Sequence, residues 1–510
     1  MNLKMRIAGL ILCLTPATAQ LAAQLEPVDL TVDDAIELAL ERGYRARVER
    51  LNLIRAEQLV KASKGRFRTQ ITMQLNAPDF QESVQPFRIP NEVPYYNTTG
   101  RLRWQSRLTI TQPLPTDGRI SLNSNLYQTR ESVFRDQLNT TDKDKRFYTS
   151  LRLELRQPLF VPNTLKLGLE RANLQHELAQ RDFTRTELDV VYQVTESFFN
   201  LYRTKRELEI AREEVEQQQE SYNLAQRKFE AGLIPEVDAL QMEVDLAQSR
   251  NNMLSAEGSL SQQEDLFKLT VGLPLEERVD VTTELRIRRF EVDQRQAVEH
   301  GLAYRSEIRE REINRRLAEI TLEQTDAQSA ISGVISAYYD LTGVSDPLLD
   351  YGSSVSRLFR SSIEDLKQRP KNRGVTFTLS LPIWDSGVNR AEVAEARATL
   401  QVTGLSEEEE RRRVTREIRA VITRLKETLG RLDVLRQSEE VALRGYEISQ
   451  ARFVNGDITS QDLALNRVRL TNARQNYLSA FIAYQLAVAD LKRNTLYDWE
   501  NGRSLVEDAS

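Results

Sequence analysis

Few side chains in this chain of 510 residues could support acid–base, nucleophilic or metal chemistry. There are two histidines, His176 and His300, and one cysteine, Cys13. A histidine can act as a base or metal ligand and a cysteine as a nucleophile, but both usually need partners of matching chemistry. Both histidines lie in charged, helical segments, and we expect them on helix surfaces. With no glycine-rich phosphate loop, His-Glu metal helix or nucleophile elbow, we expect no enzyme, cofactor or metal site.

The charge balance narrows the class of partner. Lys and Arg number 70 against 75 Asp and Glu, a formal net charge of -5, whereas a nucleic-acid binder would show a basic excess. Hydrophobic residues make up 40% and charged residues 28%, which excludes both a disordered chain and a bundle of membrane-spanning helices. Charges alternate in sign in blocks over 309–316 and 407–413, and we interpret these runs as solvated or interhelical faces.

Residues 1–19 predict an export signal. Lys4 and Arg6 precede an apolar run over 7–14, and small residues at 17–19 suit signal peptidase. The run is too short to cross a bilayer as a helix. The alternatives are an interfacial or buried helix, and lipid attachment at Cys13, which the large Leu12 disfavours. Cleavage after residue 19 would leave a cysteine-free chain with a formal charge of about -7.

One pattern occurs twice, about 224 positions apart. Its copies are Tyr222, Phe229, Gly232, Ile234 and Asp238, and Tyr446, Phe453, Gly456, Ile458 and Asp462. Upstream of each copy, apolar residues recur every seven positions, and only Glu439 interrupts the second series. Such a repeat predicts a helix that supercoils left-handedly against its neighbours.

The duplication extends over the mature chain. Each half predicts a medium helix, a β-rich stretch, a long helix, a tight glycine turn and a returning helix. The first repeat would cover 20–275, with helices over 31–66 and 165–271 and strands and loops over 68–160. The second would cover 276–496, with helices over 292–330 and 388–494 and strands and loops over 331–384, before a tail over 497–510. The helix before Gly232 would be a rod on the order of 100 Å long.

Between the helices the apolar period changes to two, which indicates strands. Residues 151–156 alternate leucine with charge, and 376–383 alternate apolar residues with Thr and Ser; 70–75 and 331–341 are similar. A half-buried sheet of a soluble protein would show the same period. With the export signal, and with aromatic residues near strand ends, we favour an outer-membrane β-barrel with a polar interior. These aromatic residues are Trp104, Tyr338, Tyr339 and Trp384.

Neither half has enough strands to close a barrel. Because lipid cannot satisfy open sheet edges, we expect several copies of the chain to contribute strands to one barrel. Segment 113–118 predicts a hairpin turn flanked by extra strands, which would give the first half one hairpin more than the second. The polar segments 78–100 and 345–372 are expected to be loops.

These features together resemble the TolC family of outer-membrane efflux proteins over essentially the whole mature chain. The most specific segments are 229–232 with Asp238, and 453–456 with Asp462. Segments 157–160 and 381–387 look like the family's strand-to-helix junctions. The resemblance implies an α+β membrane protein with an internal structural duplication. In it, a long antiparallel coiled-coil α-helical periplasmic barrel continues into a transmembrane β-barrel shared by a homotrimer.

The resemblance further implies a passive exit duct in the bacterial outer membrane, with a long periplasmic extension. Such a duct is surrounded by outer-membrane lipid and works with a periplasmic adaptor (membrane fusion protein) and an inner-membrane pump of the proton-driven or ABC type. By this analogy the adaptor would dock at the two helical turns, although the glycines there also simply end helices. The docking residues would be Gly232, Leu233, Ile234, Gly456, Asp457 and Ile458.

The same analogy implies a periplasmic constriction near Phe453, Asp462, Leu465 and Asp238. A ring of Asp462 carboxylates would favour cations. This sequence departs from the family pattern, because Leu465 stands where a second acid is frequent and Phe453 replaces a frequent tyrosine. Ile458 also offers no charge for a polar lock. We expect an apolar constriction with one carboxylate ring, unless Asp462 is only a solvated helix residue.

The cargo stays open. We favour small molecules, such as drugs or other toxic compounds, because this is the commonest use in the family. Type I protein secretion and metal efflux use similar ducts, although the mature chain offers no cysteine and few methionines for soft metals. An exported coiled-coil scaffold or adhesin would explain the seven-residue repeat but would leave the alternating strands without a role.

Overall fold

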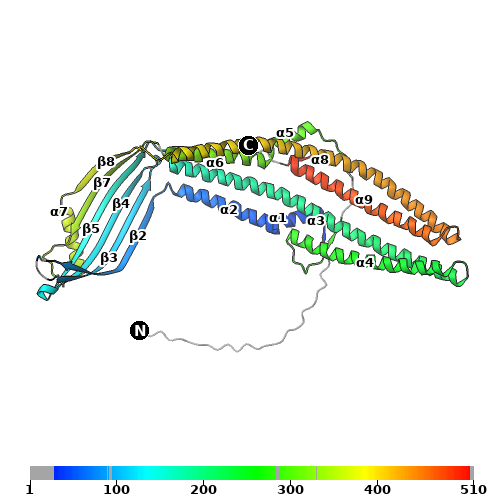
Figure 1. The fold of residues 1–510 in the computed structure, drawn as a ribbon, viewed down its shortest axis with the longest axis horizontal. Coiled ribbons are helices and arrows are strands. Elements are labelled where there is room, and N and C mark those ends of the chain that lie inside the picture. Colours follow the sequence, from blue (N-terminus) through cyan, green and yellow to red (C-terminus); the bar gives the residue numbers. More distant parts are fainter. Residues whose placement is uncertain are drawn as a thin grey trace, which may run out of the picture. The chain divides into compact units, whose positions relative to one another are not determined.

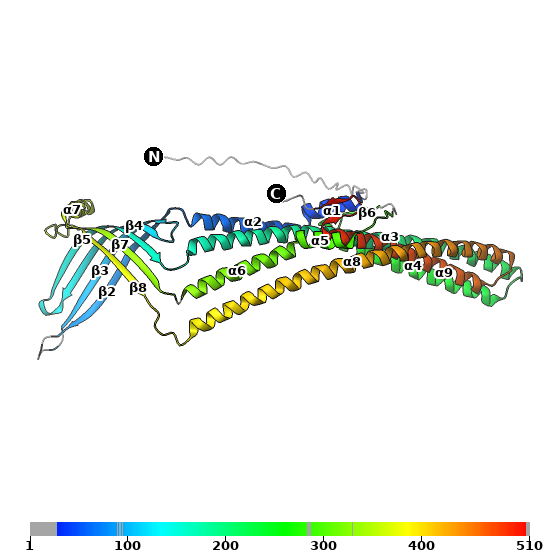
Figure 2. The ribbon, with the colours of Figure 1, turned by 90° about the horizontal axis from the view of Figure 1, so that it is seen from above.

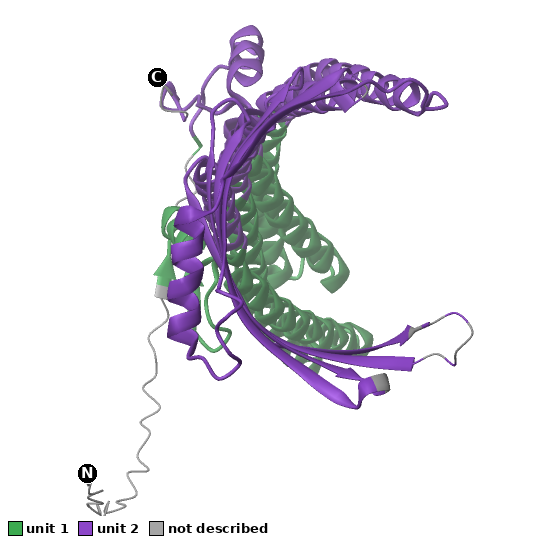
Figure 3. Ribbon diagram, turned by 90° about the vertical axis from the view of Figure 1, so that its left-hand side faces the viewer, with its two compact units in different colours: residues 1–44, 190–287, 428–486 green, residues 45–189, 288–427, 487–510 purple. Residues whose placement is uncertain are grey.

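The computed structural model describes residues 28–88, 90, 93, 95–282, 287–328 and 330–505. The expected export signal lies outside them. The chain divides into two compact units, which Figure 3 colours separately. Unit 1 draws on residues 1–44, 190–287 and 428–486, and unit 2 on 45–189, 288–427 and 487–510. Among the helices of the described chain, none has the length and apolar character needed to cross a membrane.

Unit 1 is built from helical hairpins. The first hairpin joins the end of α3 (Thr164–Glu230) to α4 (Glu236–Val271), and the second joins the end of α8 (Val388–Asn455) to α9 (Ser460–Thr495) (Figure 1). Helix α1 (Val32–Arg42) and the parallel pair β1 (Val28–Leu30) and β6 (Val279–Val281) complete the unit.

The seven-residue apolar series forms buried helix faces in unit 1. Val194, Leu201 and Leu208 of α3 are almost inaccessible to solvent. Phe199 of α3 also packs edge-on against Phe481 of α9, with ring centres 6.3 Å apart, so the two hairpins share a core. Burial of such side chains stabilises a fold by roughly 1.5–3 kcal/mol each. The repeat therefore marks the faces that hold the hairpins together.

Unit 2 contains a six-stranded antiparallel sheet in the order β2-β3-β4-β5-β7-β8, with β2 and β8 at its edges (Figures 1 and 2). The strands are β2 (Gln70–Phe87), β3 (Tyr95–Pro113), β4 (Arg119–Arg135), β5 (Thr140–Leu159), β7 (Ser332–Val344) and β8 (Asn372–Ser380). The short helix η1 (Asp136–Leu138) joins β4 to β5.

In sequence order, the helices of unit 2 precede, separate or follow the strands of the sheet. They are α2 (Tyr44–Gly65, all but its first residue), α5 (Gln294–Tyr304), α6 (Ser306–Gln328), α7 (Val355–Gln368), the first parts of α3 and α8 and the end of α9. A short pair, β9 (Tyr497–Asp498) and β10 (Arg503–Ser504), follows α9. Helices α2 and α6 lead into β2 and β7, whereas β5 and β8 lead into α3 and α8.

The strand register separates apolar from polar side chains. Residues directly opposite one another in an antiparallel pair lie on the same face of the sheet. One face is apolar across all six strands; examples are Ile71, Met73, Leu75, Leu122, Leu151, Leu153, Leu155, Ile335, Phe377 and Leu379. The other face carries residues such as Arg152, Glu154, Tyr338 and Thr376. Many apolar side chains, including Met73 and Phe377, are well exposed, so the apolar face lacks a protein cover over much of its area.

The hairpin turn predicted over 113–118 is confirmed. It joins β3 to β4, and the Leu114 N–H donates to the Gly118 carbonyl oxygen over 2.8 Å. The first half therefore contributes four strands to the sheet and the second half two.

The two loop predictions were wrong in large part. Most of 78–100 belongs to β2 and β3, which pair as far as Phe87 and Tyr95, because cross-strand hydrogen bonding accommodates polar side chains at an exposed sheet end. Segment 345–372 contains α7, whose apolar side chains pack against the sheet. The medium helices are also interrupted, at Gly43 and Arg305.

Candidate functional site

Both candidate docking turns have the same backbone geometry. Gly232 has φ +69°, a left-handed conformation that glycine adopts without strain. Its N–H donates to the Phe229 carbonyl, and the Leu233 N–H donates to the Lys228 carbonyl, both over 2.8 Å. This pair of bonds is a Schellman motif, which satisfies the carbonyls left open at a helix end.

The second turn repeats this motif. Gly456 has φ +85°, and its N–H donates to the Phe453 carbonyl over 3.1 Å. The Asp457 N–H donates to the Arg452 carbonyl over 2.9 Å. The sequence repeat therefore encodes one local structure twice, at the ends of α3 and α8.

The side chains at the two turns differ in exposure. Leu233 is 72% exposed, and Asp457 is also exposed. Ile234 is half-buried, and Ile458 packs against a cluster formed by Tyr446, Phe453, Leu463 and Leu470, here called the second-hairpin cluster. A partner could reach Leu233 and Asp457 directly, whereas Ile458 serves mainly as a packing residue.

The residues expected at a constriction do not form one exposed set. Phe453 is 4% exposed, inside the second-hairpin cluster, while its repeat counterpart Phe229 is 39% exposed. Leu465 is exposed on α9, and Asp238 is half-buried in the first turn of α4. In this conformation, Leu465 and Asp462 are the accessible members of the second repeat.

Asp462 has a local role at the start of α9. Its carboxylate accepts hydrogen bonds from the Thr459 hydroxyl (2.8 Å) and N–H (3.2 Å), and its own N–H donates to the Thr459 hydroxyl (3.2 Å). This is a capping box, which satisfies donors that a helix N-terminus leaves free. The hydrogen bonds from the Thr459 side chain and backbone hold the pKa of Asp462 below its ordinary value. The side chain is thus a fixed, solvent-facing anion.

Cations of one hairpin link it to the other, a feature that the sequence pattern did not reveal. Lys228 Nζ donates to the Phe453 carbonyl over 2.6 Å and lies 4.8 Å from the centre of the Phe453 ring. Arg467, which is buried on α9, donates to the Ser221 hydroxyl over 3.2 Å. Arg474 pairs with Glu213 over 2.9 Å. These contacts join α3 to the second hairpin at Lys228, beside the turn, and at Ser221 and Glu213, farther from it.

Comparison with known proteins decides the family. The family model for outer membrane efflux proteins matches residues 119–273 and 347–495, more than half of the chain. The chain belongs to this family. Its expected location, the bacterial outer membrane with a periplasmic helical extension, is confirmed with it, as is the resemblance from which that location was inferred.

Solved structures of outer-membrane channels share the fold of this efflux protein. CmeC of Campylobacter jejuni is 14% identical with a TM-score of 0.68, covering 94% of this chain and 87% of CmeC. VceC of Vibrio cholerae is 14% identical with a TM-score of 0.64, covering 91% and 95%. MtrE of Neisseria gonorrhoeae, in its open state, is 13% identical with a TM-score of 0.64, covering 93% and 91%. In the comparison with curated proteins, nothing matches.

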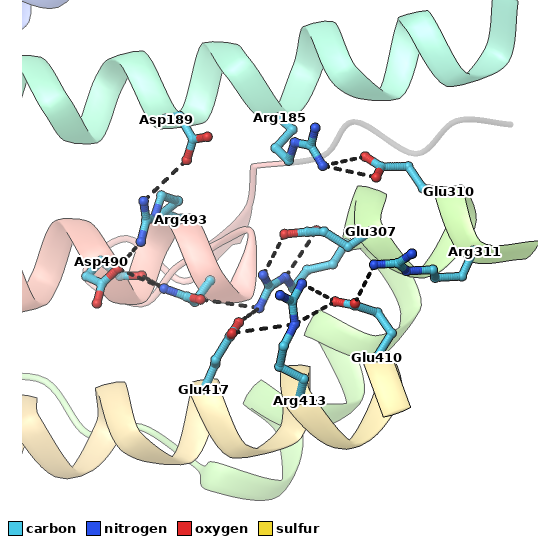
Figure 4. Close-up of polar contacts among 12 residues, drawn as sticks. Arg185, Asp189, Glu307, Glu310, Arg311, Glu410, Arg413, Glu417, Asp490 and Arg493 are labelled. Atoms are coloured by element: carbon cyan, nitrogen blue, oxygen red, sulfur yellow. Dashed lines mark hydrogen bonds and ion pairs between the residues drawn. The ribbon is translucent and has the colours of Figure 1, made fainter. Parts of the chain in front are cut away.

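The charge runs of this efflux protein are interhelical. Within unit 2, Arg311 of α6 pairs with the buried Glu410 of α8, and Arg315 pairs with Glu407 over 3.1 Å. Figure 4 shows how the contact between Arg311 and Glu410 continues through Arg413 to Glu417, which also pairs with Arg305. Both interpretations of these runs are confirmed, because pairs such as Arg311 with Glu410 link two helices, whereas Arg412 and Glu408 pair within α8 and face solvent.

Arg305 is the centre of that network. Its side chain is only 9% exposed and pairs with Glu307 over 2.6 Å and Glu417 over 3.0 Å. It also donates to the Asn494 side chain over 3.3 Å. Burial opposes ionisation of Glu307, but the hydrogen bonds and charge of Arg305 hold its pKa below the ordinary value. The guanidinium therefore keeps Glu307 ionised and links it to Glu417 and Asn494.

A cavity of about 360 Å³ adjoins this network. Both signs of charge line it, including Arg185, Asp189, Asp490 and Arg493. Arg493 bridges Asp490 (2.8 Å) and Asp189 (3.2 Å), so these charges are already paired. The cavity is better explained as a gap in a salt-bridged helix junction than as a binding site for one kind of ion.

The histidines have structural environments. His300 is half-buried rather than on a helix surface, and its Nδ1 lies 2.7 Å from the Thr495 carbonyl oxygen. The His300 ring also contacts the rings of Tyr304 and Tyr497, with ring centres 4.5 and 5.3 Å apart. His176 is also half-buried, on α3. Within the described ranges there is no group of three or more His, Cys, Asp or Glu side chains arranged to hold a metal ion.

Proposed function

We propose that this chain is one subunit of a homotrimeric exit duct in the outer membrane. The duct passes small molecules, chiefly drugs or other toxic compounds, from an inner-membrane pump and a periplasmic adaptor to the exterior. It is passive and performs no catalysis. The observation that carries this proposal is the six-stranded sheet, which has a largely exposed apolar face, a polar face and two edges without a partner strand among the described residues.

The sheet suits a barrel shared between copies. In lipid, unpaired N–H and C=O groups cost several kcal/mol each, so a spanning sheet must close. Strands β2 and β8 have neighbours on one side only among the described residues. Pairing β2 of one copy with β8 of the next would close the barrel, with the apolar face toward lipid and residues such as Arg152 and Tyr338 toward the lumen.

The second hairpin supports helix packing between copies. Val434, Val441 and Ile448 of α8 are 67%, 63% and 62% exposed and recur every seven residues. An exposed apolar stripe of this period fits a neighbouring helix in a coiled coil. We therefore place this stripe against a helix of the adjacent subunit, in a periplasmic helical barrel.

The two turns form the adaptor-docking end in this proposal. Gly232, Leu233 and Ile234 with Gly456, Asp457 and Ile458 present one shared backbone shape, with Leu233 and Asp457 as the accessible side chains. Asp462 and Leu465 would line the constriction, where three Asp462 carboxylates would form a cation-favouring ring.

No observation favours the other cargo classes, a secreted polypeptide or metal ions. A coiled-coil scaffold or adhesin would expose the apolar face of the sheet to water, and patches of this kind usually mark an interaction with lipid or protein.

Disulfide trapping tests the shared barrel. The mature chain would have no cysteine of its own, so introduced cysteines report only the designed contacts. Each variant carries one cysteine on β2, at Ile71, Met73 or Leu75, and one on β8, at Val375, Phe377 or Leu379. We expect a ladder of crosslinked species that ends at three subunits, together with conductance in planar bilayers. A matched pair on the non-adjacent strands β3 and β7, Leu102 and Ala337, should give no crosslink. Monomers that neither crosslink nor conduct would refute the duct.

A further inference from the structure

Helix α7, between β7 and β8, lies on the apolar face of the sheet. The Thr149 and Ser362 hydroxyls are 2.9 Å apart, and the Phe147 and Phe359 rings meet edge-on at 5.3 Å. A Cβ on Gly343 would come within 2.1 Å of the Ser362 carbonyl oxygen, so the helix sits directly on β7. Phe147 and Thr149 share their face with Leu151, Leu153 and Leu155, as strand alternation requires.

The outward side of α7 is cationic. Leu358 and Ser362 are fully buried against the sheet, while Arg357, Arg360 and Lys367 are exposed on the opposite side, with Glu364 among them. In the described part of the chain none of these three cations has a salt-bridge partner. Residues 355–371 hold five cations and two carboxylates, and one carboxylate, Asp365, is occupied by Arg369 (2.7 Å) and the Val344 N–H (2.8 Å).

The strands supply two more cations on the same face. Arg130 of β4 lies directly opposite Lys145 of β5. The neighbouring pair, Thr129 and Arg146, lies on the polar face, so Arg130 and Lys145 lie on the apolar face with α7. Lys145 Nζ donates to the Ser353 carbonyl just before α7, over 2.6 Å. Arg130 Nε is buried without a hydrogen-bond partner among the described residues. We call Arg130, Lys145, Arg357, Arg360 and Lys367 the outer-end cationic patch.

The outer-end cationic patch lies at the boundary between apolar and charged residues on this face of the sheet. On β5 the apolar series Leu155, Leu153, Leu151 ends at Phe147, and Lys145 follows on the same face. This is the end of the strands farther from α2, α3, α6 and α8 (Figures 1 and 2). In an outer-membrane barrel with periplasmic helices, that end meets the outer leaflet, so the patch would stand at the level of lipid headgroups.

We propose that the outer-end cationic patch binds the phosphate groups of lipid A, the phosphorylated glycolipid of the outer leaflet, and that α7 clamps this lipid against the barrel. The inference rests on the proposed function, because it requires the apolar face to contact lipid. Arginine forks and lysine ammonium groups pair strongly with phosphate at a partly dehydrated interface, and their aliphatic stems pack along acyl chains. The apolar side of α7 holds these cations in place.

Native mass spectrometry of the intact trimer, titrated with bisphosphorylated lipid A, tests the proposal. The variant Arg357→Gln/Arg360→Gln/Lys367→Gln removes exposed charges only, and Arg390→Gln/Arg397→Gln/Lys426→Gln removes three exposed charges from α8 of the same unit. We expect the first variant to lower lipid A affinity at least about ten-fold and the second to leave it within about two-fold. Lipid A lacking phosphates should bind the wild type as weakly as lipid A binds the first variant.

The other outcomes overturn the proposal in distinct ways. Equal lipid A binding by both variants would show that α7 does not hold the lipid. Equal affinity for phosphatidylglycerol would replace it with general attraction to anionic lipid, and competition by millimolar inorganic phosphate would indicate a free-anion site. Each result is read in trimers that conduct in planar bilayers. Failure to assemble or conduct would instead count against the duct.

Discussion

The contact of Lys228 with Phe453 gives the sharpest test of how the two hairpins are held together. Lys228→Met keeps most of the aliphatic stem and removes the charge that donates to the Phe453 carbonyl and covers its ring. A hydrogen bond from a charged donor contributes about 1.5–3 kcal/mol, and a cation–π contact at an exposed site about 0.5–1 kcal/mol. Because Lys228 is only half-buried, solvent screens both contributions, and we expect a net loss of about 1–2 kcal/mol.

Hydrogen exchange at the second turn measures this loss. The Gly456 and Asp457 N–H groups are bonded across the turn that Lys228 stabilises, so their exchange reports its opening. We expect Lys228→Met to speed exchange at both sites by roughly 5–30-fold, the factor that corresponds to 1–2 kcal/mol. Lys228→Arg keeps the charge and should restore most of the protection.

The repeat provides a matched control. Arg452 occupies the position on α8 that Lys228 occupies on α3, and its side chain is exposed. We expect Arg452→Met to change exchange at the second turn by less than about two-fold, as for other surface substitutions. Equal exchange in Lys228→Met and Arg452→Met would refute the idea that Lys228 fastens the hairpins.

Three further predictions concern other parts of the chain. Asp462→Asn should reduce cation selectivity in planar bilayers. Because the Thr459 hydrogen bonds lower the pKa of Asp462, the wild type should keep both its selectivity and the stability from this cap until the pH falls through that lowered pKa. A loss of selectivity already at neutral pH would contradict this prediction. Arg305→Met should destabilise unit 2 by about 3–5 kcal/mol in thermal unfolding, since it strands two partly buried carboxylates, whereas the exposed Arg412→Met should change stability by less than about 0.5 kcal/mol. Gly456→Ala should cost about 1–2 kcal/mol from its positive φ; a neutral result would show that the turn relaxes into another conformation.

The turns were predictable from sequence because their structure is encoded locally. Each glycine ends a seven-residue apolar repeat and is followed three residues later by a residue that starts the next helix, Pro235 or Thr459, which leaves few conformations for the backbone. The strand faces were predictable for a similar reason. Alternation over 151–156 fixes which side chains share a face, whatever covers that face.

The features missed by sequence depend on contacts between distant segments. The polar composition of 78–100 predicted a loop, but pairing between β2 and β3 makes most of these residues strands. Helix α7 packs on β7 because Gly343 lets the Ser362 backbone come close to the strand. The sequence of 345–372 gives no signal for this contact, since Gly343 lies outside that segment. Arg305 looks like any other arginine in a charged helix until Glu417, more than a hundred residues away, is placed beside it.

The repeat itself shows where local encoding ends. Phe229 and Phe453 occupy matching positions before matching Schellman turns, yet one is 39% exposed and the other 4%. The difference arises because the first hairpin covers the second: Lys228 and Leu224 of α3 pack against Phe453 and its cluster. Arg452 makes no equivalent contact with Phe229 among the described residues, so the first turn keeps Phe229 and Leu233 available at the surface. Duplication thus supplies two turns of the same backbone shape, and the packing of Lys228 and Leu224 against the second hairpin leaves the phenylalanine before one turn exposed and buries the phenylalanine before the other.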